Sequence, residues 1–156
     1  MALASWGVMR RLRRQGARLI DAHFAYPDGE AATRLGRWLG LPVTITLRGT
    51  EVPHSRNPAL RPRLARALDA AAWVFSVSDS LRRLAIELGA AADKTEVVGN
   101  GVDTARYHPV DRDAAREQYG LPPDAEVLVS VGARVERKGM HRVIDCLPAL
   151  IKRHPR

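Results

Sequence analysis

The sequence has little cysteine and no long apolar run. Cys146 is the one cysteine among 156 residues, so no disulfide can form within the chain, which suits a reducing compartment. No apolar run approaches the roughly 18–20 residues that a membrane-spanning helix needs. The basic cluster at residues 10–14 follows the first apolar stretch instead of preceding it, unlike a secretory signal. These absences predict a cytoplasmic protein.

Several chemical signatures are also missing. The chain has no P-loop and no GxGxxG fingerprint, which disfavours an NAD-dependent enzyme. Ser76 and Ser78 lack the Gly-x-Ser-x-Gly elbow of a hydrolase. No metal-ligand spacing relates Cys146 to the histidines at 54, 108, 141 and 154. We therefore expect no cofactor and no metal, and the lack of a helix-turn-helix, RNP or zinc pattern argues against nucleic acid.

Lysine is absent from residues 1–66, which nevertheless carry the whole net positive charge of the chain. This part holds 12 arginines and 4 acidic residues, a net charge of +8, whereas residues 67–156 hold 13 basic and 13 acidic residues. Residues 2–15 fit an amphipathic helix, with Leu3, Trp6, Met9 and Leu12 in one stripe. Such a segment can hold a protein on the inner face of an anionic membrane. Alternatively, the stripe packs on a sheet and the arginines form a solvated surface.

The rest of the chain alternates between strand and helix patterns. Strands are predicted at 18–24, 43–47, 73–77, 96–98 and 127–131, and helices at 30–39, 62–71, 78–88, 114–119 and 140–152. This alternation predicts an α/β fold with parallel Rossmann-like sheets and helices on both faces. Trp38 and Trp73 are expected in the core.

Three parts follow from this pattern. Residues 1–103 are predicted to form a partial domain, residues 104–126 a connector with Pro109, Pro122 and Pro123, and residues 127–156 the start of a second domain. Roughly 50 residues after the first domain are too few to bury a stable core. We therefore expect the chain to be a fragment that ends inside its second domain.

A basic loop separates the last predicted strand from the last helix. Residues 132–139 read GARVERKG, and a helix N-terminus offers free N–H groups to phosphate at such a place. Arg134, Arg137 and Lys138 add full charges, and Gly132 and Gly139 permit close backbone approach. The alternative is an ordinary basic turn.

Four segments in order resemble GT-B glycosyltransferases of family 4. They read DAHFAYPDG at 21–29, TITLRGTE at 44–51, FSVS at 75–78 followed by VVGNGVD at 97–103, and the loop at 132–139. The resemblance covers about residues 19–152 and is nearest to enzymes of teichuronic-acid-like or exopolysaccharide pathways. It implies a partial acceptor domain, an incomplete donor domain, retention of configuration and no obligatory metal.

The resemblance also implies roles for residues. The loop at 132–139 would bind the donor diphosphate, with Lys138 favoured over Arg134 because Ala133 stands where the family often has arginine. Arg48 replaces the histidine of many members, so it can hold an acceptor but cannot act as a neutral acid or base at pH 7. Acceptor-side candidates are His23, Tyr26, Asp28, Gly29, Arg48 and Glu51. No catalytic residue is assigned, and a lone histidine at the position of His23 is more often a structural hydrogen-bonding group.

The interdomain turn is expected at Asn100, Gly101 and Asp103, where Asn100 and Gly101 supply positive φ angles and Asp103 caps the next turn. The leading hypothesis is sugar transfer from a nucleotide-sugar donor to a polysaccharide or lipid-linked hydroxyl acceptor. The chain alone is predicted to be inactive. The competing hypothesis is a non-catalytic basic module that binds anionic membrane or nucleic acid.

Overall fold

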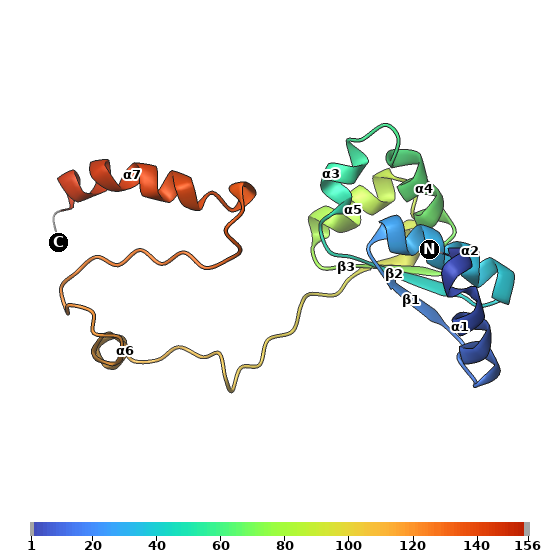
Figure 1. The fold of residues 1–156 in the computed structure, drawn as a ribbon, viewed down its shortest axis with the longest axis horizontal. Coiled ribbons are helices and arrows are strands. Elements are labelled where there is room, and N and C mark those ends of the chain that lie inside the picture. Colours follow the sequence, from blue (N-terminus) through green and yellow to red (C-terminus); the bar gives the residue numbers. More distant parts are fainter. Residues whose placement is uncertain (1, 155–156) are drawn as a thin grey trace. The chain divides into compact units, whose positions relative to one another are not determined.

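Four parallel strands form the sheet of the first of two units. The computed structural model describes residues 2–154, and the chain divides into Met1–Gly101 and Val102–Arg156. The strands are β1 (Ile20–His23), β2 (Val43–Leu47), β3 (Trp73–Ser76) and β4 (Thr95–Val97), in the order β1-β2-β3-β4 (Figure 1). The four corresponding strand predictions and the parallel α/β fold are confirmed.

The register of the strands gives the sheet one apolar face and one polar face. Ala22, Ile45 and Val74 lie side by side on the first face, each of them buried. His23, Thr46 and Phe75 form a row on the second face and are at least partly exposed. Alternate residues of a strand point to opposite faces, so the core and a solvent-facing surface share the same four strands.

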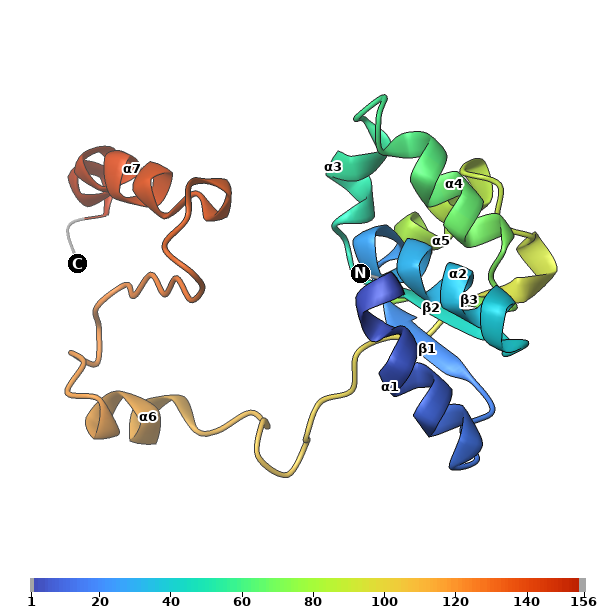
Figure 2. The ribbon, with the colours of Figure 1, turned by 45° about the vertical axis from the view of Figure 1, so that its right-hand side comes forward.

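Helices α2 (Glu30–Leu39), α4 (Arg61–Asp69) and α5 (Asp79–Glu87) lie together on the apolar face of the sheet (Figures 1 and 2). The expectation that helices cover both faces of the sheet is therefore wrong for α2, α4 and α5, which all lie on one face. Strands that follow one another in sheet order are joined by right-handed crossovers that run in one direction, and this places every connecting helix on one side.

Local sequence signals explain where these helices begin and end. Helix α2 stops at Gly40, which adopts the left-handed conformation with φ 61° that glycine tolerates. Gly36 lies so close to the loop after α2 that an added Cβ would approach the carbonyl oxygen of Leu41 to 2.7 Å. Helix α5 begins after Ser78, whose hydroxyl accepts a hydrogen bond from the Leu81 amide at 3.4 Å.

The N-terminal helix α1 (Ala2–Arg14) packs beside α2. Trp6 and Met9 are half-buried against the core, and Trp6 meets Trp38 of α2 edge to face with 5.8 Å between ring centroids. Leu3 stays 82% exposed, so only part of the predicted stripe is buried. Trp38 is 48% exposed, and its predicted place in the core is wrong.

Short elements complete the first unit. They are η1 (Ala25–Gly29), α3 (Glu51–Ser55) and η2 (Ala92–Lys94). Helix α3 begins at the end of the predicted TITLRGTE segment, where only a loop was expected. None of the helices within residues 2–154 is long and apolar enough to cross a bilayer.

The second unit contains α6 (Arg112–Gln118), η3 (Glu136–Lys138) and α7 (Met140–Arg153). Both predicted helices of this part are confirmed. The predicted strand at 127–131 is not formed, and Val129 and Val131 are 80% and 90% exposed. An extended segment becomes a strand only when another segment supplies hydrogen-bond partners, and no other segment of residues 102–154 does so. Residues 155–156, at the end of the predicted second domain, lie outside the described residues, as does Met1 at the start of the first.

Candidate functional site

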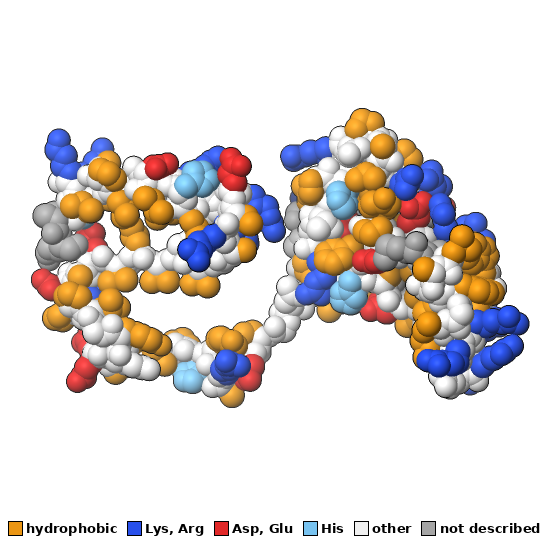
Figure 3. All heavy atoms as spheres, in the orientation of Figure 1, with side chains coloured by type: hydrophobic (Ala, Val, Ile, Leu, Met, Phe, Trp, Pro, Cys, Tyr) orange, Lys and Arg blue, Asp and Glu red, His pale blue; other side chains and the backbone are white. Residues whose placement is uncertain are grey.

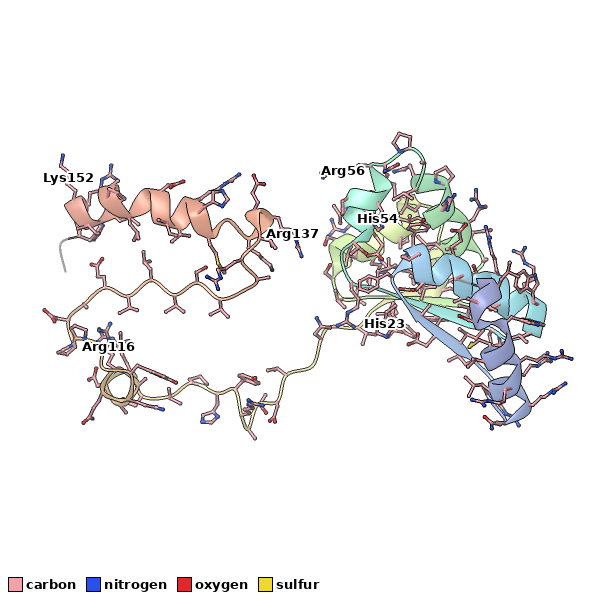
Figure 4. The ribbon with its side chains drawn as sticks, viewed as in Figure 1. His23, His54, Arg56, Arg116, Arg137 and Lys152 are labelled. Carbon is pink, nitrogen blue, oxygen red and sulfur yellow. The ribbon has the colours of Figure 1, made fainter. Side chains whose placement is uncertain are left out.

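Three side chains meet at the carboxyl edge of the sheet. Arg48, directly after β2, donates a hydrogen bond to Asn100 Oδ1 at 3.0 Å. Its other terminal nitrogen lies 3.5 Å from Nδ1 of His23, the last residue of β1. Asn100 follows β4, so a single guanidinium joins loops that are 52 residues apart in sequence. Figure 4 shows His23 on the side of the sheet away from α3, α4 and α5.

A carboxylate of the same face orders this cluster. Asp21 Oδ2 lies 3.4 Å from His23 Nε2, and Asp21 Oδ1 accepts a hydrogen bond from the Thr44 hydroxyl at 2.6 Å. Asp21 and His23 are two residues apart on β1, so both point to the polar face. The result is a chain of contacts from Thr44 through Asp21 and His23 to Arg48 and Asn100.

Sequence reasoning missed Asp21 and Thr44 as members of the cluster. The signal was present, because period-two alternation places Asp21 on the same face as His23. The pairing of Asp21 with Thr44 requires the β1–β2 register, which the sequence does not reveal. The exposed members offer a guanidinium, an imidazole and an amide, which suit a ligand rich in hydroxyl groups or negative charge.

Glu51 lies beneath this edge and connects two loops. Glu51 is only 1% exposed, and its Oε1 accepts a hydrogen bond from the Ala25 amide at 3.0 Å. Oε2 accepts one from the Gly49 amide at 2.9 Å. Both carboxylate oxygens are therefore engaged with backbone, which makes Glu51 a positioning residue for the loops after β1 and β2.

The turn after β1 has an unusual backbone. Phe24 adopts φ 71°, a conformation that non-glycine residues rarely take, and its carbonyl accepts a hydrogen bond from the Gly29 amide at 2.9 Å. Gly29 is buried, and a Cβ there would lie 2.9 Å from Ile45 Cδ1. Gly29 therefore shapes the turn from inside, whereas Asp28 is partly exposed beside it.

Tyr26 is the aromatic residue of this turn. Its ring meets that of His54 on α3 edge to face, with 5.9 Å between centroids, and the guanidinium of Arg63 lies 5.7 Å from its ring centre. Tyr26 is half-buried among these partners. It thereby fixes the turn against α3 and α4 and keeps part of its surface exposed.

The predicted tight turn at Asn100 and Gly101 takes another form. Neither residue has a positive φ angle, so that prediction is wrong. Asn100 accepts from Arg48 instead, and this contact holds the segment after β4. Asp103 does cap the following turn, since Oδ1 accepts hydrogen bonds from the Ala105 and Arg106 amides at 3.0 and 3.2 Å.

The basic loop at 132–139 belongs to the second unit. Gly139 adopts φ 70° and precedes the first residue of α7, so the helix N-terminus opens directly beyond this glycine. A Cβ on Gly132 would lie 3.8 Å from Lys138 Cδ, which places the Lys138 stem over Gly132. Arg134, Arg137 and Lys138 are exposed, and no carboxylate of the described residues pairs with them. Figure 4 labels Arg137 at this loop.

The two sets of candidates thus fall in different units. His23, Arg48 and Asn100 come together in the first unit, with Tyr26 and Glu51 supporting the adjacent loops. The loop at 132–139 stands by itself in the second. Within residues 2–154, no three histidine, cysteine or acidic side chains cluster in a way that could hold a metal ion.

Comparison with known proteins identifies relatives of this chain. The profile described as Glycosyltransferase Family 4 matches residues 1–106. TuaC of Bacillus subtilis, a glycosyltransferase whose name assigns it to teichuronic acid biosynthesis, is 30% identical over 135 residues, covering 85% of this chain and 34% of TuaC. A GDP-mannose-dependent α-(1-6)-phosphatidylinositol monomannoside mannosyltransferase of Mycolicibacterium smegmatis is 38% identical over 117 residues, covering 72% and 30%.

The crystal structure of Anabaena HepE in complex with UDP shares the fold, with a TM-score of 0.61 at 19% identity. That match covers 73% of this chain and 32% of HepE. The chain spans about a third of the length of each of these relatives.

Proposed function

Because the chain belongs to glycosyltransferase family 4, we propose that it is part of an enzyme that transfers a sugar from a nucleotide-sugar donor to a hydroxyl acceptor. The acceptor is a cell-surface polysaccharide or a glycolipid. The observation that supports this proposal is the cluster of His23, Arg48 and Asn100, because ligands of open α/β sheets bind outside the carboxyl ends of the strands.

The first unit takes the acceptor side in this proposal. Arg48 offers N–H groups to acceptor hydroxyls or to an anionic group, and the Asp21 carboxylate holds His23 beside it. Glu51 keeps the two loops in place from below. In this proposal residues 1–103 are part of the acceptor-side domain, residues 104–126 the connector, and residues 127–156 the start of the donor side.

The loop at 132–139 takes the donor diphosphate. HepE has been crystallised with UDP and with UDP-glucose, and a nucleoside diphosphate fits the chemistry of this loop. Lys138 and the amides at the start of α7 offset the negative charge that develops on the leaving nucleotide. The electrostatic task of a metal then falls to these groups, and family membership implies retention of configuration.

A titration of the isotope-labelled chain with UDP tests the donor assignment. The amide resonances of Gly132, Lys138 and Gly139 should shift saturably with UDP and stay in place with uridine, which lacks phosphate. Shifts spread evenly over the arginine-rich first unit would instead indicate non-specific anion binding. Absence of any shift at millimolar UDP would remove the assignment.

We also propose that the enzyme works in the cytoplasm, attached to the inner face of the membrane. The arginines of α1 motivate this, since Arg10, Arg11 and Arg14 are exposed on a helix without a single acidic residue. The 156 residues alone are expected to transfer no sugar, because a preorganised site needs both of its halves. A non-catalytic basic module would show the same membrane binding but no response to UDP.

A further inference from the structure

A pocket between α1 and α2 gathers arginines and tryptophans. Its volume is about 500 Å³, and it is lined by Trp6, Arg10, Arg13, Arg14, Trp38 and Leu39. Three of these six side chains are cationic and none is acidic. None of the lining residues belongs to the polar cluster at the carboxyl edge of the sheet, so the pocket is separate from the acceptor-side candidates.

The charges of this pocket are not neutralised by neighbours. Among the described residues, no carboxylate lies within 4.0 Å of Arg10, Arg13 or Arg14. Elsewhere in the same unit arginines are paired, as Arg34 is with Glu30 at 2.9 Å. Figure 3 shows Lys and Arg side chains gathered over α1, in the lower right of the view.

Its aromatic part is suited to a boundary between water and lipid. Trp38 is 48% exposed and Leu3 is 82% exposed, while the half-buried Trp6 fixes the ring of Trp38 edge to face. Trp6 and Met9 pack inward, so α1 cannot lodge its whole apolar stripe in a membrane. What remains at the surface is a set of three exposed arginines together with the indole of Trp38, which combines phosphate recognition with an interfacial anchor.

We propose that this pocket binds the phosphodiester headgroup of an anionic phospholipid at a bilayer surface. The inference deepens the membrane attachment proposed above and rests on it. Arginine binds phosphate oxygens through paired N–H groups, and the indole of Trp38 enters the headgroup layer beside it. Nucleic acid carries the same phosphodiester, but Trp38, which is 48% exposed in the lining of the pocket, suits the interfacial layer of a bilayer.

The test compares two triple variants of the full chain that lose the same charge. In the first, Arg10, Arg13 and Arg14 are changed to Gln. In the second, Arg18, Arg37 and Arg56 are changed to Gln, since these arginines are exposed, lie outside the pocket and are not on α1. Binding is measured by co-sedimentation with vesicles of equal parts phosphatidylglycerol and phosphatidylcholine, at low salt, with pure phosphatidylcholine vesicles and duplex DNA alongside.

The pocket variant should bind the anionic vesicles about tenfold more weakly than the parent chain, and the control variant less than about threefold. Fluorescence adds a second readout, because the emission of Trp38 should shift to shorter wavelength on vesicles and the shift should be lost in Trp38→Phe. Equal losses in both triple variants would overturn the pocket and leave attachment through net charge. No binding by the parent chain would overturn the attachment itself. Tighter binding to DNA than to vesicles, lost in the pocket variant, would overturn the choice of lipid.

None of these outcomes depends on UDP, so failure of the lipid proposal can be distinguished from failure of the donor assignment.

Discussion

The buried carboxylate of Glu51 should hold the site together, and the substitution Glu51→Ala tests this. The side chain accepts two backbone hydrogen bonds, from the amides of Ala25 and Gly49, and the residue is 1% exposed. Alanine removes both acceptors. The Ala25 amide is then buried without a partner, whereas the amide of Gly49 is only partly buried and can bond to water.

The size of the effect follows from these two amides. A buried donor left without an acceptor costs about 1–3 kcal/mol, and loss of the second, charge-assisted bond adds about 1 kcal/mol where water replaces it. We expect the free energy of unfolding to fall by about 2–4 kcal/mol. For a unit of this size that lowers the melting temperature by about 10–20 °C. Glu51→Gln keeps one acceptor oxygen and should lose about 1–2 kcal/mol.

Tryptophan fluorescence is the suitable assay. All three tryptophans, Trp6, Trp38 and Trp73, lie in the first unit, so their emission reports its unfolding without a contribution from the second. Glu87→Ala is the matched control, because Glu87 makes an exposed ion pair with Arg61 at 3.0 Å and such pairs contribute about 0–1 kcal/mol. If Glu51→Ala destabilised the unit no more than Glu87→Ala, the positioning role of Glu51 would be refuted.

Three further predictions concern other parts of the chain. Gly36→Ala should destabilise the first unit by about 1–3 kcal/mol although alanine favours helix, because its Cβ would meet the Leu41 carbonyl oxygen at 2.7 Å. Gly7→Ala on α1, where nothing lies within 4 Å of the added Cβ, should stabilise the unit by up to about 1 kcal/mol. Thermal unfolding in which both variants shifted the melting temperature in the same direction would contradict the packing argument. Arg48→Lys should change the free energy of unfolding by less than about 1 kcal/mol, because the hydrogen bonds of Arg48 are exposed. In an enzyme with both domains complete, the same variant should raise the KM for the acceptor, because lysine cannot contact His23 and Asn100 together. An unaltered KM would place the acceptor elsewhere. Lys138→Ala should weaken nucleoside-diphosphate binding by about 1–3 kcal/mol in such an enzyme, as measured by calorimetry. Lys152→Ala, at an exposed lysine of α7, is the control. If Lys138→Ala bound the nucleoside diphosphate as tightly as Lys152→Ala, the role would pass to Arg134 or Arg137.

Much of the fold could be predicted because its signals are local. The helix at 30–39 has an apolar period and a glycine directly after it, and α2 ends where that glycine adopts its left-handed conformation. The strand at 43–47 is a run of β-branched residues, and β2 has the same bounds. Family membership could also be predicted from the sequence, because short motifs in a fixed order are recognised without knowledge of how the chain packs.

The failures all involve partners distant in sequence. The apolar run at 127–131 looks like a strand, but pairing needs a second strand that residues 102–154 do not supply. Trp38 was expected in the core because it is large and apolar, and only the crossing of α1 over α2 shows that it borders a pocket. Asn100 was assigned to a tight turn, and the contact with Arg48 gives it another role.

By itself the sequence determined the α/β class, most helix boundaries and the basic character of the first 66 residues, because propensity, capping and charge are properties of neighbouring residues. The tertiary structure decided which face of the sheet is covered, which residues of β1 reach Arg48, and that Glu51 points inward to backbone amides. These features depend on the register of the strands and the direction of the crossovers. Both are set by the packing of segments that are far apart along the chain, and no local pattern encodes them.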